Sequence, residues 1–435
     1  MSEDIRTFFE RMAQEARAPS EVPPRMIRRA TWRRVRTTAM LGLIVALVGY
    51  GGFVGVQALD RPVRMPAAPG SCSWDVIASP NQEPDRLDND LRAVLVLSDA
   101  DVWVAGSSYV NQEGGRNFPL TMHWDGAVWS IVPVPARYGH EDVFALDATS
   151  PGDVWGIGLG HEALHWDGIR WTTVPLADPG APFWHLEAVS AVAPDDAWAV
   201  GNTATGRSGG SLVEHWDGVR WSVVEAPGPL PEPLTADAYP SLSAVDALAP
   251  GDAWATGQTE NVAPVGQSNT VALHWDGIAW TRSTTPDVAA QSGTYGHLLG
   301  VAAAGPDDVW AVGIASDQPG TFGGGDRALI EHWDGHRWTV SLTLPPDSRL
   351  VNVLALSPDE AWAVGSTGSS GSFRPLVLRW NGVQWDEVEA GITGQAALTD
   401  VSGTRSGDLW AVGTTEVDGK GRTLTLRCPR DGRGT

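Results

Sequence analysis

Lysine, cysteine and charged side chains are scarce in this chain of 435 residues. Lysine occurs once, at Lys420, and cysteine twice, at Cys72 and Cys428. Charged residues make up only 19% of the chain, whereas it holds 50 glycines and 31 prolines. This balance excludes a protein built mainly of long surface helices and favours short strands joined by turns. A chain of this length exceeds one ordinary compact domain unless it consists of repeats.

Basic residues are also few outside the N-terminal segment. Residues 1–37 hold nine arginines against five acidic residues, whereas residues 60–435 hold 21 basic and 47 acidic residues. So acidic a region repels a phosphate backbone, and we therefore expect no nucleic-acid partner.

The P-loop motif is also absent, and we expect no catalytic residue, no metal and no cofactor.

One uncharged apolar stretch covers residues 37–59. Its 23 residues are long enough to span the hydrocarbon core of a bilayer as one helix. Arginines cluster from Arg25 to Arg36, directly before it, and arginine on one flank marks the cytoplasmic side. We therefore expect a single-pass protein of the cell membrane, with residues 1–36 in the cytoplasm and the rest of the chain outside. A cleaved signal peptide ending near Ala58 is the rival interpretation.

Two features of the N-terminal region would allow contacts with other proteins. Gly51 and Gly55 form a GxxxG pair, which favours a dimer through the membrane helix. Apolar residues before the anchor share one face of a short amphipathic helix that we expect over residues 3–17. They are Ile5, Phe8, Phe9, Met12 and Ala16.

With its acidic start, proline-containing linker and arginine cluster, the segment 1–36 resembles the inner segments of actinobacterial membrane proteins of the anti-sigma type. The resemblance implies an envelope sensor or regulator that signals through the cytoplasmic helix towards a sigma factor. No cysteine precedes Cys72, so this segment lacks the His and CxxC set of the zinc-binding anti-sigma proteins.

From residue 72 onward one unit recurs. Its first half ends in Val/Ala-Trp-Ala-Val-Gly after a turn of the Pro-Asp-Asp type, and successive tryptophans of this half are 43 to 56 residues apart. Its second half reads His-Trp-Asp-Gly-x-x-Trp, in which Asp-Gly between two apolar runs is a strong hairpin signal. Four short apolar runs separated by turns make one blade of a β-propeller. The first-half tryptophans are Trp103, Trp155, Trp198, Trp254, Trp310, Trp362 and Trp410.

Counting the halves predicts the number of blades and the closure of the ring. There are seven first halves but only six complete second halves. The stretch Leu424–Cys428 aligns with a third strand, and residues 72–79, with Trp74 in the place of the last hairpin tryptophan, align with a fourth. The sequence therefore predicts an all-β, seven-bladed β-propeller over residues 72–428, with one N-terminal transmembrane helix, in which the N-terminal strand completes the last blade.

The two cysteines lie at the ends of this propeller, next to a linker over residues 60–71 and a tail over residues 429–435. Cys428 takes the place of the hairpin tryptophan before the Asp-Gly turn, and Cys72 that of the residue just after it. We expect these positions to face each other at the short separation that a disulfide needs. The compartment outside the anchor is oxidising, so a Cys72–Cys428 disulfide would replace the missing turn. Two unpaired thiols are the alternative.

The DVWAVG and HWDGxxW repeats resemble those of bacterial, actinobacterial-type, membrane-anchored propeller proteins and, more distantly, the kelch and Asp-box repeats. The resemblance covers residues 72–428. It implies the fold and names no activity.

Residues that recur in every blade are most simply structural. The acidic residue before each first-half tryptophan, such as Asp101, is interpreted as a turn and capping carboxylate. The recurring histidines, such as His123, are too far apart to share a metal ion, and we expect each to pack beside a tryptophan and bond to a neighbouring strand. The tryptophans are expected to form the core between blades.

Binding residues are expected where the blades differ, on the face that carries the long connections. The position thirteen residues before each first-half tryptophan should rim the mouth of the central channel on that face. Its polar members could bind a small polar ligand or a metal, and non-repeat aromatic residues nearby are candidate contacts for a partner or glycan. The ligand-binding candidates are Asp90, Asp142, His185, His297, Arg349, Trp184 and Tyr295, with Tyr109 and Phe183 as further aromatics.

Three hypotheses follow for the function. The first is a membrane-tethered, extracytoplasmic propeller that acts as a non-enzymatic binding module for a protein or a glycan through its loop face. The second is the envelope sensor described above. The third is a propeller hydrolase or lyase with its site at the channel mouth.

Overall fold

In a computed structural model all of the described residues lie in one unit, within Ala67–Thr435. Among the described residues no helix is long and apolar enough to cross a membrane. The predicted anchor over 37–59, the cytoplasmic helix, the GxxxG pair and Cys72 lie outside the described residues, so these predictions stay predictions. The described residues are 73–82, 88–110, 116–135, 142–205, 208–228, 239–260, 268–288, 295–316, 325–369 and 371–430.

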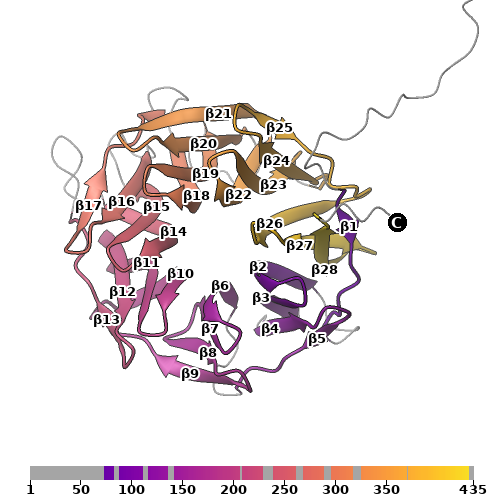
Figure 1. Cartoon of the computed structure of the whole chain (residues 1–435), viewed down its shortest axis with the longest axis horizontal. Coiled ribbons are helices and arrows are strands. Elements are labelled where there is room, and N and C mark those ends of the chain that lie inside the picture. Colours follow the sequence, from indigo (N-terminus) through magenta and orange to yellow (C-terminus); the bar gives the residue numbers. More distant parts are fainter. Residues whose placement is uncertain are drawn as a thin grey trace, which may run out of the picture. The chain divides into compact units, whose positions relative to one another are not determined.

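These residues form a ring of seven antiparallel four-stranded sheets, which confirms the predicted fold (Figure 1). We number the sheets blades 1 to 7. Blade 1 consists of β2 (Asp88–Ser98), β3 (Asp101–Val110), β4 (Arg116–Trp124) and β5 (Trp129–Ile131). Blade 2 consists of β6 (Val143–Ser150), β7 (Asp153–Gly158), β8 (Glu162–Trp166) and β9 (Trp171–Pro175). Blade 3 consists of β10 (Phe183–Ala193), β11 (Asp196–Thr205), β12 (Ser208–Trp216) and β13 (Trp221–Val223). Blade 4 consists of β14 (Tyr239–Ala249), β15 (Asp252–Glu260), β16 (Thr270–Trp275) and β17 (Trp280–Ser283). Blade 5 consists of β18 (Tyr295–Gly305), β19 (Asp308–Ser316), β20 (Arg327–Trp333) and β21 (Trp338–Pro346). Blade 6 consists of β22 (Ser348–Ser357), β23 (Glu360–Thr367), β24 (Arg374–Trp380) and β25 (Trp385–Glu387). Blade 7 consists of β26 (Ala396–Gly403), β27 (Leu409–Val417), β28 (Lys420–Cys428) and β1 (Asp75–Val76).

Blade 7 closes the ring with a strand from the other end of the described chain. Strand β1 pairs with β28 through Asp75↔Arg427 and Val76↔Leu426, and Figure 1 shows these two strands side by side at the seam. Ile77 N continues the ladder by donating to Thr425 O at 3.0 Å. The split blade predicted from the repeat count is therefore confirmed. The hydrogen bonds between β1 and β28 complete blade 7 and cover the edge of β28.

Tight turns fix the register of each blade. In the outer hairpin of blade 1, Asp125 Oδ1 accepts the backbone N–H groups of Ala127 and Val128, each at 2.9 Å. Gly126 between them has a φ of 96°, which a residue with a Cβ rarely adopts. The glycine that ends the Trp-Ala-Val-Gly motif has another role, since a Cβ on Gly106 would lie 2.0 Å from the carbonyl oxygen of Asp90 on the inner strand.

The antiparallel order gives the disc two different faces. The tight turns, from first to second strand in every blade and from third to fourth in blades 1 to 6, lie on one face, which we call the turn face. The connections from second to third strand and from blade to blade lie on the opposite face, which we call the loop face. The inner strands therefore begin at the loop face, where the candidate ring of residues was predicted.

Tryptophans form the core between neighbouring blades, as predicted. Between blades 1 and 2, the ring of Trp103 lies 4.8 Å from that of Trp166 and 5.3 Å, edge-on, from that of Trp171. Each first-half tryptophan is at most 2% exposed. Across the seam, Trp410 of blade 7 packs in the same way on the hairpin pair of blade 1. These clusters use the large apolar area of indole to join each blade to the next.

Candidate functional site

The recurring histidine, aspartate and tryptophan form one unit in each of blades 1 to 5. In blade 5, His332 Nε2 lies 2.6 Å from Asp308 Oδ1, and its ring stacks on Trp310 with centroids 4.0 Å apart. The equivalent His–Asp distances in the other four blades are 2.7 to 2.8 Å. The histidines thus pack beside tryptophan, as predicted. The interpretation of these aspartates as turn caps is wrong, because each holds the histidine of the third strand.

Blades 6 and 7 carry arginine in place of this histidine. Arg379 lies over the first-half tryptophan of blade 6, 5.5 Å from the ring centroid, with Nη2 3.8 Å from Glu360 Oε1. Arg427 lies 5.8 Å over Trp410 and pairs with Asp408. The unit is therefore scaffold in all seven blades, with a carboxylate and either a histidine or an arginine around each tryptophan.

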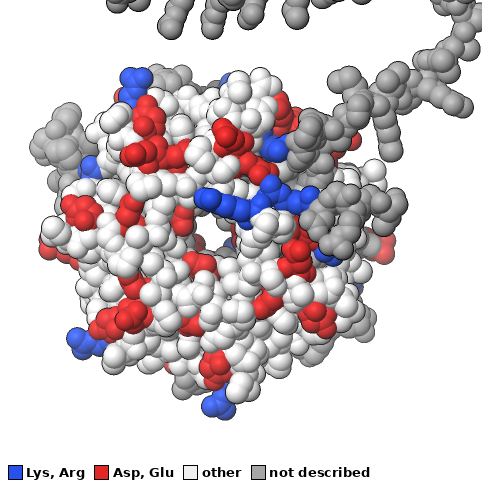
Figure 2. All heavy atoms as spheres, viewed as in Figure 1, with Lys and Arg blue, Asp and Glu red and all other residues white. Residues whose placement is uncertain are grey.

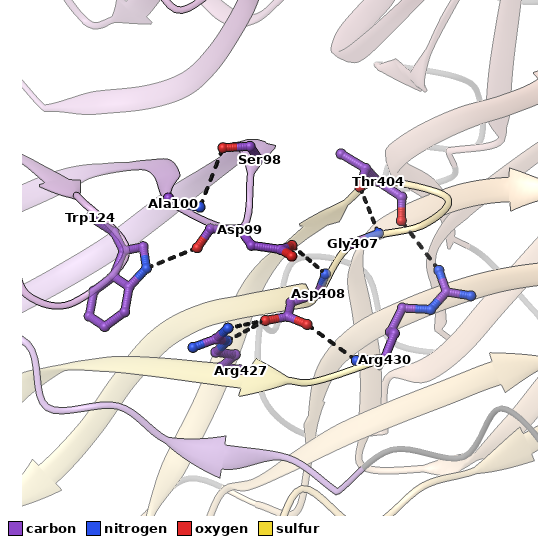
Figure 3. A network of polar contacts seen from close by, with 9 residues as sticks. All are labelled: Ser98, Asp99, Ala100, Trp124, Thr404, Gly407, Asp408, Arg427 and Arg430. Atoms are coloured by element: carbon purple, nitrogen blue, oxygen red, sulfur yellow. Dashed lines mark hydrogen bonds and ion pairs between the residues drawn. The ribbon is translucent and has the colours of Figure 1, made fainter. Parts of the chain in front are cut away.

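Asp408 also centres a polar network that joins the last blade to the first (Figure 3). Its backbone N–H donates to Asp99 Oδ1, in the tight turn of blade 1, at 2.9 Å. Its carboxylate accepts from the side chain of Arg427 and from the backbone N–H of Arg430, the latter at 3.2 Å. Arg430 in turn pairs with Glu360 of blade 6. These charges are satisfied within the protein, so the network secures the seam rather than offering a ligand site.

At the loop-face mouth of the channel, the two predicted aspartates share one arginine. Arg92 Nε lies 3.2 Å from Asp90 Oδ2, and Arg92 Nη2 lies 3.8 Å from Asp142 Oδ2. Thr414 of blade 7 also bonds to Asp90, whose pKa is raised, chiefly by burial. The sequence reasoning missed Arg92, although an arginine two residues from a candidate aspartate on one strand is a signal that the sequence offers.

The two predicted histidines are each held by a neighbour. His185 Nε2 lies 2.8 Å from Glu187 Oε1, and this bond raises the pKa of His185. His297 Nε2 lies 2.8 Å from the hydroxyl of Ser243 on blade 4, and burial lowers the pKa of His297 to about 4. The hydroxyl of Tyr295 lies 3.4 Å from His297 Nδ1. His297 is therefore neutral at neutral pH and is positioned between two hydroxyl groups.

The remaining candidates contact aromatic partners. The guanidinium of Arg349 lies over the ring of Phe373, 5.2 Å from its centroid. Trp184 stacks on His161 with centroids 4.3 Å apart and an interplanar angle of 9°. The structure thus brings together the two aspartates, and the tyrosine with the second histidine, but no larger set of the candidates. Among the described residues, no group of three His, Cys, Asp or Glu could hold a metal ion.

Below the mouth, the inner strands line a channel with a volume of about 410 Å³. Asp147 and Asp246 on these strands each accept a backbone N–H from the next blade at 2.7 Å, and burial raises the pKa of each to about 6. Asp400 accepts Val94 N across the seam at 2.6 Å, and burial raises its pKa to about 7. These carboxylates join each blade to the next by accepting its backbone N–H groups.

Two stretches match catalytic signatures in their letters. Residues 161–165 read His-Glu-Ala-Leu-His, the HExxH pattern, but Glu162 to His165 lie in strand β8 and His161 directly precedes it, whereas the zinc site needs a helix to bring both histidines to one ion. The two histidines have different partners, Trp184 for the first and Asp153 for the second. Residues 206–210 match GxSxG, but Ser208 begins strand β12 instead of lying on a turn from strand to helix.

Cys428 is completely buried, and no described cysteine is a free thiol. In the intact blades the hairpin tryptophan pairs with the tryptophan five residues on, as in Trp216↔Trp221. The register of β1 and β28 places Trp74 next to Cys428, and both belong to the same core cluster, while the expected facing of the two cysteines across the hairpin stays a prediction. Cys72 lies outside the described residues, so its disulfide with Cys428 stays a prediction.

Apolar side chains are exposed along one arc of the loop face. Tyr109 at the end of β3, Leu159 just after β7 and Phe183 at the start of β10 are 38%, 46% and 72% exposed. They come from three successive blades, and Trp184 follows Phe183 directly. We call these four residues the apolar arc. Leu159 was missed from the sequence because an isolated leucine at a strand end has no recognisable pattern.

Charge is unevenly distributed round the ring. Figure 2 shows a central opening on the face in view, acidic side chains spread around it, and a group of basic side chains over the region of β22 to β27. The strands and turns of blades 6 and 7 are rich in arginine, whereas the mouth at blades 1 to 3 is predominantly acidic. The arginines of blades 6 and 7 are Arg349, Arg374, Arg379, Arg405, Arg422, Arg427 and Arg430.

Comparison with known proteins supports the fold alone. No protein-family model and no curated protein matches the chain. Among solved structures, YCF48 bound to D1 peptide matches with a TM-score of 0.52 at 16% identity, over 86% of this chain and 100% of that one. The WD40 β-propeller domain of Doa1 matches with 0.51 at 12% identity, over 82% and 98%, and the polysaccharide lyase Uly1 with 0.51 at 10% identity, over 84% and 94%. These identities establish a propeller and no activity.

Proposed function

We propose that this protein is a membrane-tethered, extracytoplasmic binding module that recognises a segment of a partner protein on its loop face, without enzymatic activity. The observation that carries the proposal is the apolar arc beside the acidic channel mouth. Exposed apolar side chains that come from adjacent blades and are not required by the repeat are typical of interaction surfaces. The mouth residues, in contrast, are held in pairs by their neighbours and form no catalytic constellation.

The charges beside the arc define the partner more closely. Asp90, Asp142 and Glu187 lie at this part of the mouth, against the cations Arg92 and His185. Three carboxylates against one permanent cation make this region attractive to a basic segment. The partner segment that fits best carries apolar side chains for the arc and a lysine or arginine for the mouth.

The point at which the described chain enters the ring is compatible with this use of the loop face. The chain enters at Ser73 and Trp74, next to the turn face, because Trp74 occupies the fourth-strand position just after an outer hairpin turn. This entry point lies on the face opposite the proposed binding surface.

The solved structures offer precedents of the same kind. YCF48 has been seen with a D1 peptide bound, and the ring of that protein is matched over nearly its whole length by this chain. Propellers commonly present binding residues on loops held by a rigid scaffold. A peptide or protein ligand is therefore the leading candidate for this ring as well.

The experiment that tests the proposal uses the full chain in nanodiscs and a display library of extended peptides. We expect selected peptides to be rich in apolar and basic residues and to bind the variants Phe183→Ser and Tyr109→Ser at least about tenfold more weakly, which corresponds to about 1.4 kcal/mol. The matched control is Ile278→Ser, which changes a side chain that is 85% exposed on the turn face. Equal binding of the selected peptides to all of these proteins would refute the proposal.

A further inference from the structure

A second cavity lies at the outer edge of the ring, between blades 4 and 5. It has a volume of about 610 Å³, within the range of about 300 to 1,000 Å³ that is usual for small-molecule sites. One wall is the end of β17 and the connection after it, Ser283 to Pro286. The other side is formed by Trp333, Trp338 and Val340 of blade 5.

The cavity exists because blade 4 lacks two aliphatic side chains that other blades place at this position. Three and five residues after its outer tryptophan, blade 2 has Val174 and Leu176, which pack against blade 3. Blade 4 has Ser283 and Thr285 at the same positions. The corresponding pairs that pack against the next blade are Val132 and Val134, Val224 and Ala226, and Val388 and Ala390.

This exchange replaces an apolar contact by a wall of hydroxyl groups. Within the described part of the chain, the hydroxyls of Ser283 and Thr284 bond to no other protein group. Thr285 Oγ1 donates to Thr270 O at 2.8 Å, so its oxygen can still accept a hydrogen bond. Three neighbouring hydroxyls with unused capacity therefore line a cavity that the protein itself does not fill.

The opposite side of the cavity is aromatic. Trp333 is half-buried, with its ring 5.1 Å from that of Trp254, and Trp338 is 4% exposed. Both indoles are fixed by the core between the blades, and Trp333 offers most of the aromatic surface that a ligand could contact.

The rim of the cavity holds an arginine, which is unusual in so acidic a chain. His336 and Arg337 of the outer hairpin line it. The turn position of His336 is an exposed aliphatic residue in other blades, for example Ile169 and Ile278. The side chain of Arg337 is 77% exposed and its Nε lies 3.9 Å from Asp334 Oδ2, a loose surface pair that leaves the guanidinium able to bind an anion.

We propose that this cavity is a saccharide-binding site that prefers sugars carrying a carboxylate. The C–H face of a sugar ring can bury against the fixed indoles, while its hydroxyls bond to those of Ser283, Thr284 and Thr285. A sugar carboxylate can pair with the guanidinium of Arg337 at the rim. The site lies at the outer edge of the ring and does not include the apolar arc, so it is independent of the proposed protein-binding function.

The test uses the full chain in nanodiscs and titration calorimetry with hexuronic-acid oligosaccharides and neutral hexose oligosaccharides of equal length. The double variant Ser283→Val/Thr285→Leu copies the pair that blade 2 already uses, so we expect it to fold and to fill the cavity. It should bind the uronic-acid probe at least about tenfold more weakly. The matched control is Thr281→Val, an exposed position on the same strand that does not line the cavity, and it should bind normally.

Two further variants separate the sources of binding. His336→Ala/Arg337→Ala changes only exposed rim residues and should remove the preference for the uronic-acid probe over the neutral one. Phe183→Ser should leave saccharide binding unchanged. The proposal is overturned if the wild-type chain binds neither probe at millimolar concentration, if the filled variant binds as well as the wild type, or if Phe183→Ser abolishes binding.

Discussion

The indole rings of Trp74 and Trp362 meet edge-to-face, with centroids 5.8 Å apart and planes at 86°. Trp74 lies at the start of the described chain, and Trp362 lies in blade 6. At the other interfaces the first-half tryptophan packs on two hairpin tryptophans, but here Cys428 takes the place of one of them. Among the described residues, Trp74 therefore supplies the one tryptophan contact that this interface makes with the closing strand.

We expect Trp74→Ala to open the ring at the seam. The side chain is 5% exposed and belongs to the core cluster of blades 6 and 7, so its loss should lower the free energy of unfolding by about 3 to 5 kcal/mol. Urea unfolding followed by circular dichroism measures this. The control is Val76→Ala in the same strand, where the side chain is 60% exposed and the change should be small. If the two variants unfold at the same urea concentration, strand β1 does not secure the ring.

The predicted Cys72–Cys428 disulfide can be tested on the same chain. Cys428 is buried next to Trp74, and Cys72 is two residues before Trp74 in the sequence, so the bond would fix the closing strand next to the turn face. Mass spectrometry of the unreduced protein should find one peptide pair joined through both cysteines, and Cys72→Ser should lower the free energy of unfolding by about 2 to 4 kcal/mol. Alkylation of both cysteines without a reductant would contradict the bond.

The fold could be predicted from the sequence because each blade repeats its turns. The Asp-Gly hairpins and the regular first-half tryptophans fix strand number and register locally, and Trp74 identifies the split blade by its match to Trp129. The partners of the repeat residues were harder to predict. An aspartate is a common residue both for a turn cap and for a cross-strand partner. Only the pairing of the second and third strands, which sets Trp310 opposite His332, shows that the Asp308 side chain reaches His332.

The candidate site was predicted less well, for a physical reason. The thirteenth position before each tryptophan lies at the start of the inner strand, towards the loop face, but the sequence gives no indication which neighbour takes up each charge. Arg92 lies between two aspartates of different blades, and His297 bonds to Ser243 of the blade before its own. Such contacts between blades depend on the three-dimensional ring, not on the repeat. The Ser283 and Thr285 exchange, in contrast, is visible as soon as the blades are aligned.

The histidine unit should contribute to stability without any role in binding. His332→Ala leaves the Asp308 carboxylate, whose side chain is 18% exposed, without its histidine, and we expect the free energy of unfolding to fall by about 1 to 3 kcal/mol. His336→Ala, four residues further in the same hairpin and exposed, is the matched control and should unfold like the wild type. Urea midpoints give the comparison. An equal effect of both substitutions would mean that the His–Asp contact is not what stabilises the blade.

A buried carboxyl group should make the stability of the ring depend on pH. Glu331 is 0% exposed, and its Oε1 accepts from Thr270 Oγ1 at 2.9 Å, but its Oε2 has no partner among the described residues. Its counterpart in blade 3, Glu214, accepts the backbone N–H of Ala177 at 2.9 Å. The residue equivalent to Ala177 in blade 4 is Pro286, which has no N–H to donate.

Burial raises the pKa of Glu331 from 4.5 to about 8, so the folded protein binds this proton more tightly than the unfolded chain does. Stability must then fall as the pH rises from about 4.5 to about 8, because ionisation costs more in the folded state. Glu331→Gln keeps an acceptor for Thr270 and removes the ionisation. We expect this variant to gain stability over the wild type as the pH is raised from 5 to 8 in urea unfolding. Glu387→Gln, an exposed glutamate, should show no such trend. A difference between Glu331→Gln and the wild type that stays constant with pH would mean that Glu331 does not titrate in this window.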